Sequence, residues 1–354
     1  MTAVHVVVPE GIDDPAAPSG GNTYDRRVCL GLASLGWSVH EHAVPGPWPH
    51  PGAAALAALT GAVQTIPDGA LVLLDGLVAS TAPEVLVPEA RRLQLVVLVH
   101  MPLGLRASQE ADGTRGRERA VLSAAAAVVT TSAWTRDRLL ELYRLPAERV
   151  GVARPAVDAA DPATGTAAGG ALLCVAAVTF DKGHDLLLGA LTAIADLSWQ
   201  CTCVGSLDRD PMFAQDLRVR AQQSHVRERV RFVGPRTGAD LDRTYAAADL
   251  LVLASRAETY GMVVIEALSR AIPVLATDVG GLGEALGFGA EGVRPGLLVA
   301  PDDSASLATA LRAWLVDAHL RARLRRAASD RRASLPGWST TASAIAEVLE
   351  NASR

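Results

Sequence analysis

The chain has 354 residues, of which 49% are hydrophobic and 20% charged, and its formal net charge is −5 at pH 7. This length accommodates two domains of about 150 residues, and the hydrophobic share is enough for two cores. Acidic and basic residues are interspersed along the sequence. The composition therefore argues against nucleic-acid binding, for which a basic stripe would neutralise phosphates.

The apolar runs, such as 93–99, have the length of strands and fall well short of the roughly 20 residues of a membrane span. Residues 1–5 carry no basic region of the kind that opens a signal peptide. We therefore expect a cytoplasmic protein without stable membrane insertion. No further Cys or His lies at ligand spacing, so we expect no metal site and four reduced core thiols, at Cys29, Cys174, Cys201 and Cys203.

Strand and helix patterns alternate along the first 157 residues. Strands are expected at 4–8, 37–44, 71–74, 93–99 and 128–129. Helices are expected at 24–35, 53–63, 115–126 and 135–143. This alternation is typical of a mostly parallel sheet covered by helices on both faces, as in a doubly wound α/β domain.

Residues 158–170 are small, polar and Gly-rich, which is typical of a linker. The alternation then restarts and predicts a second α/β domain over 171–337. Its expected strands are 172–177, 200–204, 230–233, 250–254, 273–276 and 297–300. A last helix is expected in the tail 338–354, with Ser339 as its N-cap.

The segment 255–266 places two carboxylates either side of a strand-to-helix turn. Glu258 falls in the loop after a short apolar strand, and Glu266 lies about a turn and a half into the following helix. Both side chains can reach one crevice, with the backbone N–H groups of Gly261 and Met262 between them. Such a site suits a polyhydroxylated ligand with a negative tail.

Lys182 is the single lysine among 33 basic residues. It follows an apolar strand pattern and precedes a helix pattern, at a turn where phosphate binding is favoured. A compact ammonium with three rotatable donors suits a phosphate in a confined space, where the planar fork of arginine would need more room.

The spacing Glu258–x7–Glu266, with Gly261 inside it, resembles the signature of glycosyltransferase family 4, which are retaining, nucleotide-sugar-dependent enzymes. Other pieces agree in order along nearly the whole chain: Ser19-Gly20-Gly21-Asn22, Val99-His100, Lys182-Gly183, Val204-Gly205-Ser206, Phe232-Val233-Gly234 and residues 278–284. The resemblance implies the GT-B fold, in which two doubly wound Rossmann-like domains, here 1–157 and 171–337, face each other across a cleft. It also implies that the helix in 338–354 completes the first domain.

The resemblance further implies a hexosyltransferase that moves a sugar from a nucleoside diphosphate, UDP or GDP, to an acceptor hydroxyl, without a metal or other cofactor. Lys182 would stabilise the leaving diphosphate, while Glu258 and His100 would contact the donor sugar. The other donor-binding residues would be Gly20, Gly21, Gly205, Ser206, Gly234, Arg256, Tyr260, Gly261, Met262 and Glu266. Within this set Glu266 is matched to the ribose.

One departure from the family pattern is Ala177, which stands where the family has an arginine that shares the diphosphate with the lysine. A charge-assisted hydrogen bond contributes about 1.5–3 kcal/mol, so another cation is expected to substitute. Arg256 is the preferred candidate, with Arg236 as the weaker one. Asp75, at the end of its strand, is a further candidate for loop positioning or acceptor binding.

Two other functions remain open from the sequence. A phosphorylase of the same architecture would need a second lysine for its pyridoxal cofactor, and none is present. A nucleotide-sugar-binding or partner subunit that has lost catalysis is compatible with Ala177.

The segment 104–119, with acids Glu110, Asp112 and Glu118 among its arginines, is expected to be a mobile loop on the acceptor side. The interspersed acids argue against its binding anionic lipid. The sequence leaves the oligomeric state open.

Overall fold

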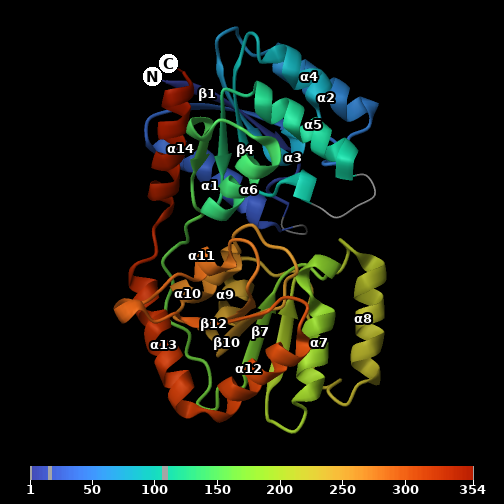
Figure 1. The fold of residues 1–354 in the computed structure, drawn as a ribbon, viewed down its shortest axis with the longest axis vertical. Coiled ribbons are helices and arrows are strands. Elements are labelled where there is room, and N and C mark those ends of the chain that lie inside the picture. Colours follow the sequence, from blue (N-terminus) through green and yellow to red (C-terminus); the bar gives the residue numbers. More distant parts are fainter. Residues whose placement is uncertain (1, 15–17, 106–110, 354) are drawn as a thin grey trace. The chain divides into compact units, whose positions relative to one another are not determined.

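A computed structural model describes residues 2–14, 18–105 and 111–353. The chain divides into two compact units (Figure 1). The first comprises Met1–Asp14, Ser19–Pro155 and Trp338–Arg354, and the second comprises Pro15–Pro18 and Ala156–Gly337. The first unit is therefore built from the two ends of the chain, with the second unit inserted between them.

The first unit contains a six-stranded parallel sheet in the order β2-β1-β3-β4-β5-β6. Its strands are β1 (Ala3–Pro9), β2 (Ser38–Val44), β3 (Leu71–Asp75), β4 (Gln94–Val99), β5 (Ala127–Thr130) and β6 (Val150–Val152). Its helices are α1 (Gly20–Ser34), α2 (Ala53–Gln64), α3 (Gly76–Ala79), α4 (Pro83–Glu89), α5 (Ala111–Ala124), α6 (Ala133–Tyr143) and α14 (Trp338–Ala352), with short 3₁₀ turns η1 (Leu103–Leu105) and η2 (Ala147–Arg149). The central strands are buried on both faces, which explains their continuous apolar sequences.

The second unit repeats this plan with the order β12-β11-β10-β7-β8-β9. Its strands are β7 (Ala171–Val175), β8 (Gln200–Val204), β9 (Val230–Phe232), β10 (Leu250–Leu253), β11 (Val274–Thr277) and β12 (Gly296–Val299). Its helices are α7 (His184–Ala193), α8 (Pro211–Gln223), α9 (Gly238–Ala246), α10 (Met262–Ser269), α11 (Leu282–Leu286), α12 (Ser304–Val316) and α13 (Ala318–Ala333), with 3₁₀ turns η3 (Phe180–Lys182) and η4 (Ala290–Gly292). The predicted α/β fold of two mostly parallel sheets is confirmed.

The predicted mobile loop over 104–119 is wrong where the structure describes it, because α5 begins at Ala111. Glu118 is fully buried, although the sequence around it is charged. Its carboxylate accepts hydrogen bonds from the Ser80 hydroxyl, from the N–H groups of Leu103 and Gly104, and from the Tyr143 hydroxyl. Residues 106–110, which include Glu110, lie outside the described residues.

The structure adds detail to two further sequence predictions, the linker and the start of the last helix. The expected linker 158–170 has no helix or strand, but it is bound to the second unit, because the carboxylate of Asp249 accepts hydrogen bonds from the N–H and hydroxyl of Thr166 and from the N–H of Ala171. Ser339, the expected N-cap, lies inside α14, which begins at Trp338.

Helix α14 packs against α1, β4 and β5 in the first unit (Figure 1). The Thr341 hydroxyl donates to the carbonyl of Arg154 at 2.7 Å, and the rings of Trp338 and Tyr24 meet edge to face. A Cβ on Gly31 of α1 would come within 2.5 Å of the Ala342 Cβ, so the two helices cross closely only because residue 31 is glycine. Among the described residues, no helix is long and apolar enough to cross a membrane.

Candidate active site

The single lysine and one of the two signature glutamates form an ion pair in the second unit. Lys182 ends the turn η3 after β7, and Glu258 lies in the loop after β10. The Lys182 Nζ lies 2.5 Å from the Glu258 Oε1, and the two side chains are 29% and 12% exposed. The Ser255 hydroxyl also donates to the same oxygen, at 3.4 Å. The structure therefore joins two residues that are 76 positions apart in the sequence.

Glycine at position 183 makes this meeting possible. Gly183 has a φ of +64°, and a Cβ there would lie 1.9 Å from the carbonyl oxygen of Ala254 at the end of β10. The N–H of Arg256 donates to the carbonyl of Asp181 at 2.7 Å. These close backbone contacts hold the Lys182 turn against the Glu258 loop.

Backbone hydrogen bonds also connect the loops at the carboxyl ends of β7, β8 and β9. The Val178 N–H donates to the carbonyl of Ser206, and the Gly205 N–H donates to the carbonyl of Gly234. Gly205 has a φ of +152°, and a Cβ there would lie 2.0 Å from the Ala176 carbonyl oxygen. Three predicted donor-binding positions, 205, 206 and 234, are thus in one cluster of loops at the strand ends, where ligands bind in sheets of this kind.

Helix α10 begins directly after the signature loop, with Gly261 as its N-cap at a φ of +89°. Gly280 and Gly281 pack on that loop, because Cβ atoms there would lie 1.5 Å from the Glu258 carbonyl oxygen and 2.2 Å from the Thr259 carbonyl oxygen. The loop at 280–281 therefore supports the Glu258 backbone. Tyr260 is buried beneath it.

The second signature glutamate has a different partner. The Tyr245 hydroxyl of α9 donates to Glu266 Oε2 at 2.8 Å. Burial raises the pKa of the Glu266 carboxyl above its ordinary value, and the hydrogen bond from Tyr245 opposes this shift. No hydrogen bond or ion pair between described residues links Glu258 to Glu266.

Arg256, the predicted substitute for the missing family arginine, already has several partners. Its guanidinium binds both oxygens of Asp185 at 2.9 and 2.8 Å, as well as Asp302 at 2.7 Å. It also donates to the carbonyl of Phe180 and stacks over that ring. Its pKa lies above the ordinary value, with the hydrogen bond to Asp185 as the largest cause.

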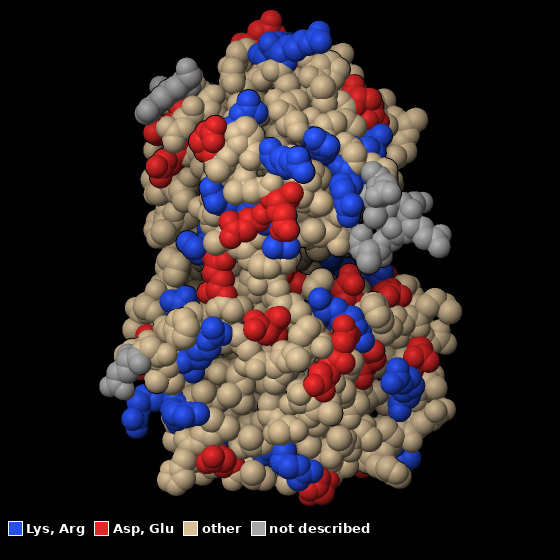
Figure 2. All heavy atoms as spheres, viewed as in Figure 1, with Lys and Arg blue, Asp and Glu red and all other residues tan. Residues whose placement is uncertain are grey.

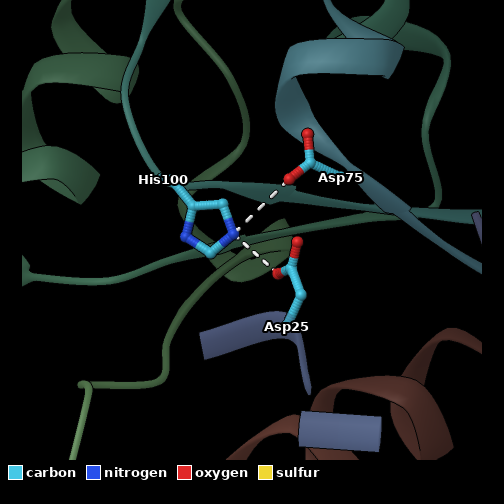
Figure 3. Close-up of side chains that lie close together, drawn as sticks. All are labelled: Asp25, Asp75 and His100. Atoms are coloured by element: carbon cyan, nitrogen blue, oxygen red, sulfur yellow. Dashed lines mark hydrogen bonds and ion pairs between the residues drawn. The ribbon is translucent and has the colours of Figure 1, made fainter. Parts of the chain in front are cut away.

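The first unit has its own polar cluster at the carboxyl ends of neighbouring strands (Figure 3). Asp75 ends β3, His100 follows β4, and Asp25 projects from α1. His100 Nε2 lies 2.7 Å from Asp25 Oδ1 and 3.6 Å from Asp75 Oδ2. The imidazole is 16% exposed, whereas the two aspartate side chains are only 3% and 4% exposed.

The pKa values of His100 and Asp75 are both raised in this buried cluster. Burial opposes a charge on His100, but the Asp25 carboxylate outweighs it and raises the pKa of His100 to about 9. Burial, reinforced by the Asp25 charge, raises the pKa of Asp75 to about 8. The three ligand atoms lie within 4.8 Å of one another, which makes this the one described group spaced to hold a metal ion.

Sequence reasoning identified His100 and Asp75 but missed Asp25 and Tyr245. The glycine-rich segment is positioned near His100, because a Cβ at Gly21 would be 3.4 Å from His100 Cδ2. Gly20 opens α1, and Ser19 caps the helix by accepting from the N–H of Asn22. The one sequence feature that could have pointed to Asp25 is its place about a turn and a half into α1, just after the glycine-rich segment, but it does not show which way the side chain points.

The surface carries charges of both signs. Figure 2 shows basic and acidic side chains interspersed on the face in view. An open cavity of about 600 Å³ in the second unit includes Arg231, Arg236 and Arg243 in its lining. Lys182 and Glu258 do not line it. The four cysteines are free and buried.

Residues 169–317 match the model of the glycosyl transferases group 1 family. A D-inositol 3-phosphate glycosyltransferase of Catenulispora acidiphila is 33% identical over 296 residues, which cover 75% of this chain and 69% of the relative. The chain belongs to the group 1 glycosyltransferases. A glycogen synthase of Mycobacterium tuberculosis is also 33% identical, over 64% of this group 1 chain and 54% of its own length. The chain thus spans between about half and two thirds of these relatives.

Solved structures confirm the fold of this group 1 glycosyltransferase. Sucrose-phosphate synthase from Thermosynechococcus elongatus superposes with a TM-score of 0.81 at 23% identity, covering 99% of this chain and 98% of that one. The HepE protein of Anabaena, solved in complex with UDP-glucose, gives a TM-score of 0.78 at 18% identity and covers 99% and 100% of the two chains. The predicted GT-B fold and the resemblance to the glycosyltransferases are both confirmed.

Proposed function

We propose that this group 1 glycosyltransferase moves a sugar from a nucleoside diphosphate to an acceptor hydroxyl with retention of configuration, and that Lys182 stabilises the departing diphosphate. The observation that carries the proposal is the ion pair between Lys182 Nζ and Glu258 Oε1, in a loop cluster where glycines at 183 and 205 allow close backbone approach.

The pair explains how one site can bind both the diphosphate and the sugar of a donor. In the free protein Glu258 satisfies the Lys182 ammonium. An incoming diphosphate brings a stronger negative charge to Lys182, and the Glu258 carboxylate is then released to accept hydrogen bonds from sugar hydroxyls. Charge that develops on the leaving diphosphate meets an ammonium already in position, which lowers the barrier to bond cleavage.

The remaining parts of the proposal follow from neighbouring residues. We assign the ribose to Glu266, whose Tyr245 partner fixes its orientation, and the base to the loop at Gly234. UDP is the preferred nucleotide, because the HepE protein is described with UDP and with UDP-glucose. Lys182 and the N–H groups at the start of α10 supply the positive potential that a metal provides in other transferases.

Retention requires the acceptor to attack from the face that the diphosphate leaves. The acceptor hydroxyl would then lose its proton to the departing phosphate oxygen, so no carboxylate is needed as a covalent nucleophile. The relatives are named for inositol phosphate and glycogen acceptors, which are both polyhydroxylated. A polyhydroxylated acceptor is therefore the class we propose for this chain.

Calorimetric titration of UDP, GDP, ADP and dTDP in the presence of EDTA tests the donor site. We expect one nucleotide to bind, with an affinity that falls about 10- to 100-fold in Lys182→Ala. Glu258→Gln should bind the free nucleoside diphosphate as tightly as wild type or more tightly, because it releases the lysine, yet should lose sugar transfer. Arg312→Ala, an exposed cation of the same unit, is the matched control.

Turnover separates the enzyme from a subunit that only binds. Nucleotide release from the preferred sugar donor is measured with polyhydroxylated acceptors, and the anomeric configuration of the product is read by NMR. Binding without turnover on any acceptor would favour the degenerate-subunit alternative. An inverted product would rule out the retaining mechanism, and no nucleotide binding at all would refute the donor site.

A further inference from the structure

We propose that Asp25 and Asp75 act as positioning residues that hold His100 through Nε2 and keep its imidazole doubly protonated, so that Nδ1–H is left as a fixed donor for a ligand. The proposal rests on the proposed sugar transfer for its purpose, but its structural claim concerns the first unit alone. Figure 3 shows both carboxylates gathered on the Nε2 side of the ring.

The ring is held from several directions. Asp25 Oδ1 accepts from Nε2 at 2.7 Å, and the Leu77 N–H fixes Asp75 by donating to its Oδ1 at 2.6 Å. The Tyr24 ring meets the imidazole edge to face at 5.2 Å between centroids, and its own hydroxyl is tied to the carbonyl of Ala153. These contacts come from α1, from the end of β3 and from the segment after β6. A histidine needed only for packing would not require two buried carboxyl groups.

The charges identify where the protons lie. Two ionised carboxylates next to one imidazolium would leave an uncompensated negative charge in an almost fully buried site, which is costly. One proton on Asp75 and two on His100 make the cluster neutral, with Asp25 as the single carboxylate. The pKa values of Asp75 and His100 are raised to about 8 and 9, which favours the protonated form of both groups at neutral pH, as in this assignment.

Asp25 Oδ2 supplies the independent observation. It is buried and has no hydrogen-bond partner among the described residues. A buried carboxylate oxygen without a donor makes a second negative charge nearby unfavourable. Asp25 Oδ2 therefore favours the protonated form of the neighbouring Asp75. Among the described residues of this unit, the titratable groups in contact with the imidazole are Asp25, Asp75 and Tyr24, and the Tyr24 hydroxyl donates to the carbonyl of Ala153.

The arrangement has a use in the proposed reaction. Since Nε2–H is committed to Asp25, the donor left for a ligand is Nδ1–H, which has no partner among the described residues. A charged imidazolium donates more strongly than a neutral ring and cannot act as a base while Asp25 holds its second proton. His100 would therefore orient a hydroxyl or stabilise developing negative charge, and would not remove a proton.

A divalent cation could occupy the same three ligand atoms, but it would require an unprotonated Nε2. The 2.7 Å approach of Nε2 to Asp25 Oδ1 is that of a charge-assisted hydrogen bond. We therefore assign a proton to this position, and stoichiometric metal in the purified protein, lost together with activity on chelation, would overturn the assignment.

Histidine-selective ¹⁵N NMR of the full chain between pH 6 and 10 tests the proposal without needing turnover. We expect both His100 nitrogens to stay protonated past pH 8 in the wild type, with the signal assigned through His100→Gln. Asp25→Asn should bring the midpoint down toward the ordinary histidine value of about 6.5, because the carboxylate is lost. Asp75→Asn should lower it less, since asparagine resembles the protonated acid. Equal shifts, or no shift, would refute the proposal.

Activity gives the second readout. Asp25→Asn should lower kcat about 10- to 100-fold and move the alkaline limit of the pH profile to lower pH, while nucleotide affinity at the Lys182 site is retained. Asp75→Asn should lower kcat less, and the exposed Asp137→Asn is the control for an aspartate of this unit. If the wild type neither binds nor transfers, the proposed function fails while the NMR titration still decides the state of His100.

Discussion

Charged side chains are enclosed in two different ways in this protein. Glu118 of α5 is fully buried, and its two oxygens receive four donors from Ser80, Leu103, Gly104 and Tyr143. Asp25, also buried, has one oxygen on His100 and the other without a described partner. The same contrast separates two cations of the second unit. Arg256 binds two carboxylates and a carbonyl, whereas the one partner of Lys182 among the residues that the structure describes is Glu258.

The difference distinguishes structural charges from charges available for chemistry. A carboxylate that is saturated with donors has no remaining capacity to bind a ligand, and its removal leaves several buried donors unpaired. A charge with one partner can exchange that partner for a substrate or a proton. The functional candidates of this chain are the less saturated members of each pair, Asp25 and Lys182.

The largest expected effect is on stability. Glu118→Ala should lower the free energy of unfolding of the first unit by about 4 kcal/mol, because a charged acceptor with several donors is lost. Urea unfolding followed by tryptophan fluorescence measures the change. Sugar transfer per folded molecule should stay near the wild-type value. If the variant were stable but inactive, Glu118 would have a functional role, and the distinction between saturated and unsaturated charges would be wrong.

A smaller effect is expected on the pH dependence of stability. His100 and Asp75 both bind protons more tightly in the folded state, so the stability that these two groups contribute is present at low pH and is lost as pH rises through their folded pKa values, about 9 for His100 and about 8 for Asp75. We expect the free energy of unfolding of the first unit to fall between pH 6 and about pH 9, because the folded state still holds these protons where the unfolded state has released them. The slope should be shallower in His100→Gln, and an unchanged slope would show that the cluster does not bind the extra protons.

The smallest expected effect is that of Arg256→Ala, which distinguishes Arg256 from Lys182. Arg256→Ala should cost about 1–2 kcal/mol of stability in the second unit through lost contacts with Asp185. It should change nucleoside diphosphate affinity no more than about threefold, compared with the much larger loss proposed for Lys182→Ala. An equal loss of affinity in both variants would restore Arg256 as the substitute for the arginine missing at Ala177.

Much of the fold was predictable because parallel strands buried on both faces have apolar sequences that stand out. Lys182 and Glu258 were predictable for a related reason, since each follows such a strand. Asp25 and Glu118 were not, because each lies in a polar helical stretch whose local pattern does not show which way a side chain points. Their partners are up to 75 and 38 positions away in the sequence. The interior contact becomes visible only when the sheet brings those segments together.

The position of α14 has a consequence for how the protein is made. The first unit needs α14 to cover α1 and β5, and the close fit of Gly31 on Ala342 and of Gly151 on Val348 shows that this cover is specific. During synthesis from the amino end, all of Ala156–Gly337 leaves the ribosome before α14 does. The second unit can therefore fold while the first still exposes the apolar surface reserved for its last helix. During synthesis the second unit would then complete its folding before the first unit, although the first unit begins earlier in the sequence.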